Sequence, residues 1–152
     1  MEQLNEYRAR LLDRLEESAR EFRAAFQSVK EANAPQAEGW SAHQIAVHTR
    51  DVHKMVYGAR IQRTIAEENP LFENFDGDAW MAEQYDPNEP LASILDGLAD
   101  SVSQTVAALR AIPPAAWSRP SRHETYGAGF TAQTWVERSL AHIEEHLKAV
   151  SG

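Results

Sequence analysis

Two histidines stand one helical turn apart near the end of the chain. His142 and His146 belong to the segment Thr131–Val150, whose sequence is TAQTWVERSLAHIEEHLKAV and whose apolar residues recur at helical spacing. Residues four apart lie on nearly the same face of a helix, with Cβ atoms roughly 6 Å apart, so two imidazoles at this spacing can share one metal ion. The apolar stripe places both histidines on or beside the buried face of the helix. The pair predicts a metal site that takes further ligands from elsewhere.

His48 is the candidate for a third ligand. It lies in a predicted helix that starts after Ser41 and ends near Glu68, and it shares the expected inward face with a set of mostly apolar residues: Ile45, Val52, Met55, Val56 and Ala59. His43 and His53 lie well round the helix from that face and are expected at the surface or rim. Catalytic zinc sites commonly use three protein ligands and leave the fourth position to water, which suits this set.

Four predicted helices must position these histidines. Apolar residues recur with the period of a helix over the ranges Glu2–Ala32, Ser41–Glu68, Pro90–Arg110 and Thr131–Val150. No segment shows convincing strand alternation, and no internal repeat is present. The sequence therefore predicts an all-α fold, a four-helix bundle that forms a single domain over residues 1–152.

Local signals mark where two of these helices begin. Ser41 and Gln44 have the spacing of a capping box, in which each side chain bonds the other residue's backbone N–H. Before the last helix, Phe130 and Thr131 have the pattern of a hydrophobic staple and an N-cap, with Trp135 at the position that Phe130 would touch. Both starts are predicted from residue type and spacing alone.

The connections predict the order of the bundle. The loop Asn33–Trp40 is short enough to make the first two helices antiparallel neighbours. The segment Pro70–Glu89 is rich in aromatic and acidic residues, and its length permits a crossover of roughly 30 Å, which makes the third helix parallel to the second. The predicted order is up-down-down-up, with the second and fourth helices antiparallel.

This order brings the three histidines to one level. At 1.5 Å per residue, His48 lies roughly 10 Å from the start of its helix, and His142 and His146 lie roughly 12 and 6 Å from the end of theirs. If those two helix ends lie together, the three imidazoles meet. The sequence therefore predicts a divalent metal bound by His48, His142 and His146.

Composition narrows the class of protein. The chain has a net charge of -8 and no basic stripe, which argues against a nucleic-acid partner. It contains no run of about 18 apolar residues and no signal peptide at its N-terminus, so we expect a cytoplasmic protein with no membrane segment. Cysteine is absent, so a thiol used in any reaction would have to come from a small cofactor.

These motifs resemble the DinB-like (DinB/YfiT) superfamily of four-helix metal-binding proteins. The resemblance covers nearly the whole chain and is carried by Trp40-Ser41 with His48 and Asp51 in WSAHQIAVHTRD, by the crossover ENPLFENFDGDAW, by the entry from Gly127 to Thr131, and by the terminal HIEEH. It implies an up-down-down-up bundle, a metal on the three histidines and frequent homodimers. Activities known in the family include bacillithiol S-transferases and mycothiol-dependent maleylpyruvate isomerases.

The main functional hypothesis is a metal-dependent enzyme that acts on a small molecule. A metal ion held by three neutral histidines retains its charge and can lower the pKa of a bound thiol or water, which predicts a thiol-dependent S-transferase or a hydrolase. Zinc or nickel is expected, while iron and copper also suit imidazole ligands. Asp51 is a candidate for orienting a ligand imidazole.

Two alternatives stay open from the sequence. The same site in a non-catalytic metal or ligand-binding module would be structural or sensory, and a fourth protein ligand would favour that interpretation. HIEEH also matches an inverted zinc-protease motif in which Glu145 would be the general base, but only six residues follow His146, too few to supply the downstream ligand of that class.

Overall fold

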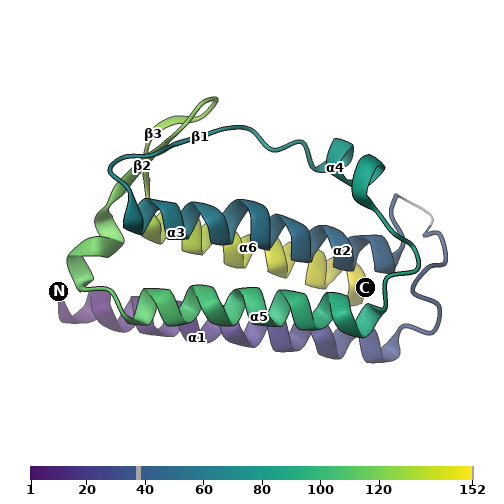
Figure 1. Ribbon diagram of the computed structural model, residues 1–152. Helices are drawn as coiled ribbons and strands as arrows, with labels where there is room; N and C mark the ends of the chain where they lie inside the picture. The colour runs from purple at the N-terminus through teal and green to yellow at the C-terminus, as the bar shows by residue number, and fades with distance from the viewer. Residues whose placement is uncertain (37–38, 152) are drawn as a thin grey trace.

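The structure, a computed structural model, describes residues 1–36 and 39–151, and within this part four long helical segments form a bundle (Figure 1). The segments are α1 (Glu2–Ala25), α2 with α3 (Ala42–Val52 and Gly58–Ala66), α5 (Leu91–Arg110) and α6 (Ala132–Ser151). The predicted loop between the first two helices includes residues 37 and 38, which lie outside the described residues.

The helices run along a common axis. Figure 1 shows α1 leading away from the N-terminus, and α2 and α3 running in the opposite sense, across the bundle from α1. The crossover then carries the chain back along the outside of the bundle, α5 runs in the sense of α2 and α3, and α6 runs in the sense of α1. Helix α1 packs against α5 and α6, and α2 packs against the same two helices. The histidine-bearing helices α2 and α6 are therefore direct neighbours.

The predicted helix starts are confirmed. The Ser41 side chain accepts a hydrogen bond from the Gln44 backbone N–H at 3.1 Å, and the Gln44 side chain accepts from the Ser41 N–H at 2.9 Å. At the start of α6, Thr131 Oγ1 accepts from the Thr134 N–H at 3.2 Å. The rings of Phe130 and Trp135 stack with centroids 4.9 Å apart, as the staple requires.

The second helical segment is interrupted by a π-helical turn, η2, at His53–Tyr57. A π-turn holds one more residue than an α-turn and is frequent at functional sites. The first helix is also shorter than predicted, because α1 ends at Ala25 and a 3-10 turn, Phe26–Ser28, follows instead of further α-helix to Ala32. Sequence periodicity indicated neither change.

A small sheet corrects the expectation of an all-α fold. The strands are β1 (Leu71–Phe72), β2 (Pro120–His123) and β3 (Gly127–Thr131), in the order β1-β2-β3. Strand β1 pairs with β2 in parallel, and β2 pairs with β3 as an antiparallel hairpin. Strands of two to five residues are too short to show alternation, and their pairing joins segments about fifty residues apart in the chain. The sheet ties the crossover to the entry of α6.

The crossover carries a short helix of its own, α4 (Gly77–Gln84), capped by Asp76, whose side chain accepts from the Ala79 N–H. Aliphatic and aromatic side chains from the four long segments fill the core between them. Those that are essentially inaccessible include Leu15, Phe22, Ile61, Ile94, Leu98, Trp135 and Ile143. None of the helices in the described ranges has the length and hydropathy that crossing a bilayer requires.

Candidate metal centre

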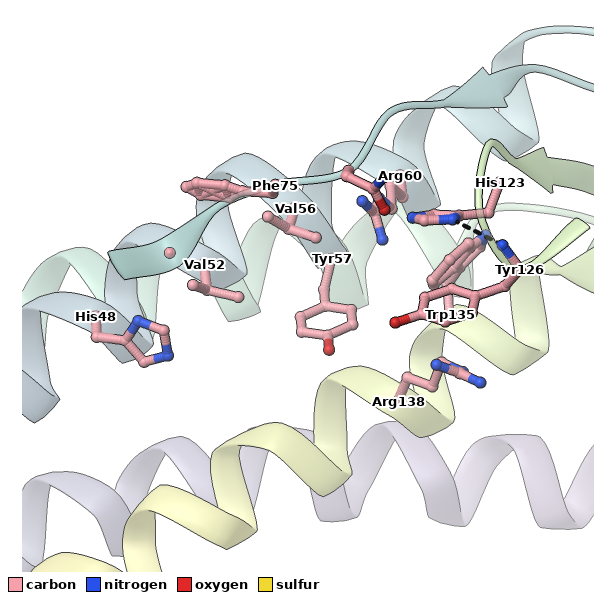
Figure 2. A pocket seen from close by; sticks show the side chains of 12 residues that line it. His48, Val52, Val56, Tyr57, Arg60, Phe75, His123, Tyr126, Trp135 and Arg138 are labelled. Carbon is pink, nitrogen blue, oxygen red and sulfur yellow. Dashed lines mark hydrogen bonds between the residues drawn. The ribbon is translucent and has the colours of Figure 1, made fainter. Parts of the chain in front are cut away.

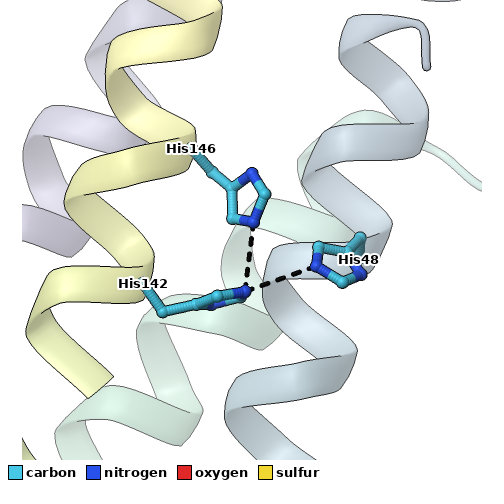
Figure 3. Close-up of side chains that lie close together, drawn as sticks. All are labelled: His48, His142 and His146. Atoms are coloured by element: carbon cyan, nitrogen blue, oxygen red, sulfur yellow. Dashed lines mark hydrogen bonds between the residues drawn. The ribbon is translucent and has the colours of Figure 1, made fainter. Parts of the chain in front are cut away.

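The three predicted histidines meet between α2 and α6. Figure 3 shows His48 reaching across from α2 toward His142 and His146, which project from successive turns of α6. His142 Nε2 lies 3.0 Å from His146 Nε2 and 3.3 Å from His48 Nε2. The ligand atoms of all three side chains lie within 4.8 Å of one another.

This spacing fits a metal ion. Zinc–nitrogen bonds of about 2.0–2.1 Å at a tetrahedral angle place two ligand nitrogens about 3.3 Å apart. The pairs that His142 forms with its two neighbours lie at or close to that separation. Within the described residues, no fourth histidine, cysteine or carboxylate joins this group. The donor set is therefore three imidazoles with room for an exogenous ligand.

Burial keeps the imidazoles neutral, which is the form that binds a metal. Desolvation, followed by the nearby His146, lowers the pKa of His48 to about 4, although Asp78 and Asp51 act in the opposite direction. Desolvation, with His146 and His48, lowers the pKa of His142 to about 3. The pKa of His146 is also lowered by desolvation. At neutral pH each ring therefore has one nitrogen lone pair to offer.

Packing fixes the ring of His48. The indole of Trp40 lies against it at a centroid distance of 4.8 Å. On another side the chain at Gly77 approaches so closely that a Cβ there would lie 3.3 Å from His48 Cε1. The crossover therefore contributes to the site by confining a ligand ring.

His142 is held by rings and by burial. The Tyr57 ring lies 5.4 Å from the His142 ring, and Nδ1 of His142 is buried without a hydrogen-bond partner among the described residues. Since Nε2 is the nitrogen that faces the other histidines, ligation through Nε2 would leave a proton on Nδ1.

The structure contradicts the expectation that His43 and His53 lie at the surface or rim. His43 is 2 % exposed; its Nε2 donates to the Glu89 carbonyl, and its Nδ1 is hydrogen-bonded with the Tyr85 hydroxyl. His53 is fully buried, and its Nδ1 lies 2.8 Å from Ser101 Oγ on α5. The reason is that α2 has two neighbouring helices and a covering crossover, so its buried face is wider than one stripe. The same prediction placed Met55 on the inward face of the helix, but Met55 is 44 % exposed.

Asp51 does not orient a ligand imidazole in this structure, which corrects that expectation. Its carboxylate accepts hydrogen bonds from Arg50 Nε at 2.9 Å and from the Trp80 indole N–H at 3.0 Å. Because Trp80 belongs to α4, Asp51 anchors the crossover to α2. Its charge still acts on His48, where it favours the protonated ring.

The Glu145 side chain lies on the exposed face of α6. It affects the cluster only through its charge, which favours the protonated form of His146. A general base would have to face the reacting group, so this position gives no support to the protease motif.

A pocket of about 260 Å³ opens beside His48 and runs beneath the crossover toward the sheet (Figure 2). Sequence reasoning did not identify its polar lining residues, which are Tyr57, Arg60, Asn74, His123, Tyr126 and Arg138. Arg138 stands four residues before His142, a signal available in the sequence. The π-turn places Tyr57 and Arg60 in the pocket, and the strand pairing places His123 there. Residue spacing in the sequence indicated neither feature.

Comparison with known proteins agrees with this architecture. The sequence model of the DinB superfamily matches residues 3–150. Among solved structures, YfiT from Bacillus subtilis superposes with a TM-score of 0.78 at 24% identity, covering 94% of this chain and 85% of that one. That protein is described as "a probable metal-dependent hydrolase with an unusual four-helix bundle topology". A search of curated proteins found no match. With nearly its whole length matched by the family model, the chain belongs to the DinB superfamily.

Proposed function

We propose that this protein is a metal-dependent enzyme that acts on a small molecule, built as an up-down-down-up bundle. His48, His142 and His146 would hold one divalent cation, zinc or nickel by preference. The observation that carries the proposal is the convergence of three neutral imidazoles, one of which, His48, lines a pocket large enough for a small substrate.

Bound to such a site, the cation would act as a Lewis acid toward a water or thiol and so supply a nucleophile near neutral pH. The protein's own contribution is to keep the three rings neutral and fixed. Tyr57 adds a donor, because its hydroxyl is protonated at neutral pH and burial raises its pKa further. That hydroxyl faces the pocket between the histidines and its far end, where it can bind a substrate oxygen (Figure 2).

Two reactions use this arrangement. Hydrolysis with water as the nucleophile is the simpler one, and it is in line with the description of the similar YfiT as a probable metal-dependent hydrolase. Transfer to a low-molecular-weight thiol is the other, and it would need an external thiol because the chain has no cysteine. A thiol with a pKa near 8.5 is only a few per cent ionised at pH 7, so ionising it would gain roughly tenfold or more in rate.

A non-catalytic metal or ligand-binding module is the competing proposal. Structural sites normally have a closed coordination sphere, with four protein ligands in the case of zinc. In the described residues the group contains three such side chains, and a pocket adjoins it at His48. Both observations favour a site with an exogenous ligand.

The direct test is the metal content of protein purified without a histidine tag. We expect one divalent ion per chain by elemental analysis, and less than a tenth of that in the His142→Ala/His146→Ala variant. His43→Gln is the control, because His43 is a buried histidine on α2 that lies outside the cluster. Full metal retention in the double variant would refute the proposed site.

Catalysis needs its own assay. Metal-loaded protein should accelerate either ester hydrolysis or the attack of bacillithiol, mycothiol or glutathione on epoxides, activated aryl halides or maleylpyruvate. The chelated protein and the double histidine variant serve as controls. If no substrate in the panel reacts and spectroscopy shows a saturated coordination sphere without water, the binding module replaces the enzyme.

A further inference from the structure

Two arginines face the end of the pocket away from the histidines. Arg60 comes from α3 and Arg138 from α6, and both line the cavity (Figure 2). Among the described residues neither forms an ion pair, whereas other arginines, such as Arg14, Arg50 and Arg110, contact carboxylates. In a chain of net charge -8, two cations without a carboxylate partner at one cavity are conspicuous.

Aromatic rings hold these guanidinium groups instead of carboxylates. The Arg60 guanidinium lies 4.9 Å from the Trp135 ring and donates to the Glu73 carbonyl at 2.9 Å. Arg138 lies 5.0 Å from the Phe130 ring. Such stacking positions a guanidinium and leaves N–H groups at its edge free to bind a ligand.

The two positive charges disfavour each other. Burial lowers the pKa of Arg60, and the charge of Arg138 adds to this effect, while Tyr57 and Tyr126 act in the opposite direction. A group that is partly desolvated beside a like charge is stabilised when an anion binds between them. The arrangement is therefore that of a binding site for a negative group.

His123 adds a fixed neutral donor to the same end. Its ring is 4 % exposed, and its Nδ1 accepts the backbone N–H groups of Thr125 and Tyr126 at 3.1 and 3.2 Å. A neutral imidazole that accepts at Nδ1 carries its proton on Nε2. The ring lines the cavity, and its pKa is lowered by burial first and then by the charges of Arg60 and Arg138, against the effect of Glu124.

The histidines and arginines are spaced for one small ligand. Arg138, His142 and His146 follow one another at intervals of four residues on α6, so each step is about 6 Å along the helix. On the opposite wall, His48 lies at one end of the pocket, and Arg60 lies toward the other end, where His123 and Tyr126 are (Figure 2). A small molecule held by the guanidinium groups could therefore extend along the pocket toward the imidazole cluster.

We infer that the pocket takes a small molecule bearing a carboxylate or phosphate group, which Arg60 and Arg138 bind while its reacting part lies at the three histidines. The substrate class follows from the charge and shape of the cavity. The inference deepens the proposed function, and its assignment of the reacting end rests on that function. The anion site itself can be tested without metal.

Calorimetric titration of chelator-treated protein tests the anion site directly. Succinate and inorganic phosphate are the anionic probes, and dimethyl succinate is the neutral counterpart. We expect at least one anion to bind with about millimolar affinity or better. Affinity should fall at least about tenfold in Arg60→Gln/Arg138→Gln, because charge-assisted hydrogen bonds are lost. Dimethyl succinate should not bind. Whichever of succinate and phosphate binds more tightly indicates whether the ligand's anionic group is a carboxylate or a phosphate.

The control Arg10→Gln/Arg20→Gln removes the same charge from exposed positions of α1 and should bind as the wild type does. Because Arg60 also packs on Trp135, the single variant Arg138→Gln, at an exposed position, keeps the test valid if the double variant is unfolded by circular dichroism. Its affinity should fall roughly threefold or more. No anion binding by the wild type, or equal binding by wild type and the arginine variants, would overturn the inference. His142→Ala/His146→Ala should still bind the anion, so failure of the metal site and failure of the anion site give different results.

Discussion

His142 lies between the other two histidines, and both neighbours approach its Nε2. Its neutrality depends on burial, which is also what holds the pKa of the fully buried His53 at about 4. Because the folded protein keeps these rings neutral, its stability against unfolding decreases at acid pH. An unfolded chain takes up a proton on each of them near pH 6.5, whereas the folded protein resists until far lower pH.

Metal-free protein should therefore lose stability as the pH falls. The lowered pKa values of His53, His48 and His142 contribute fully above pH 6.5, and that contribution disappears as the pH falls toward 4 and then 3. His53 alone should account for about 3 kcal/mol of this loss. Urea denaturation of chelated protein between pH 7 and 4 measures it. A shallower pH dependence is expected for His53→Gln, and an unchanged slope would contradict this account.

Replacing Tyr57 with phenylalanine should slow the reaction without loss of metal. The hydroxyl is protonated at neutral pH and faces the pocket, so its removal takes one hydrogen bond from a substrate bound near His142. A roughly tenfold fall in kcat is expected. Steady-state kinetics with the reactive substrate, together with elemental analysis of the same sample, gives the result. Equal kcat values for Tyr57→Phe and wild type would show that the Tyr57 hydroxyl does not contribute to the reaction.

At the scale of elements, the crossover acts as one wall of the site. Trp80 on α4 donates to Asp51, and the Arg50 guanidinium bonds Glu89, so α2 holds the crossover at two places. Gly77, three residues before Trp80 in the same crossover, comes against the ring of His48. A side chain at Gly77 would have to displace either that ring or α4.

Gly77→Ala should weaken metal binding by roughly tenfold, since the outer contacts of a ligand imidazole typically matter by that factor or more. The added methyl group would lie 3.3 Å from His48 Cε1. Wild-type protein is the reference, and circular dichroism of Gly77→Ala checks that the variant keeps its fold. Competition with a chromogenic chelator measures both affinities, and identical values would show that the crossover does not confine His48.

Elements with local signals could be predicted, and those that depend on tertiary pairing could not. The Ser41 capping box, the Phe130–Trp135 staple and the convergence of His142 with His48 all follow from spacing within a helix and the order of helices. The sheet arises when Leu71–Phe72 meets Arg122–His123, a contact between distant segments. His53 was misplaced because one periodic stripe cannot describe a helix with two packed neighbours.

For the whole molecule, the charge distribution sets an expectation about ligands. The chain is acidic, with a net charge of -8, so its general field repels anions while the pocket arginines attract them locally. Added salt screens both effects. Binding of an anionic ligand should therefore be a property of the pocket and should fail elsewhere on the surface.

We also expect a homodimer. The expectation follows from the frequency of dimers in the family and from the aromatic residues of the connections, among which Tyr126 is 66 % exposed. Sedimentation equilibrium at micromolar concentration should give twice the chain mass of 17.1 kDa. A mass equal to that of a single chain would refute it.

The number of residues in the π-turn at His53–Tyr57 sets the direction in which Arg60, after the turn, projects from the helix relative to His48, before it. Deleting one residue there, such as the exposed Lys54, would restore continuous α-helix and rotate everything beyond it by about 100°. Tyr57 and Arg60 would then leave the wall that His48 occupies, although no side chain in the site had been replaced. Two chains with identical histidines and arginines, differing by that one insertion, would present their metal and their anion-binding groups to different substrates.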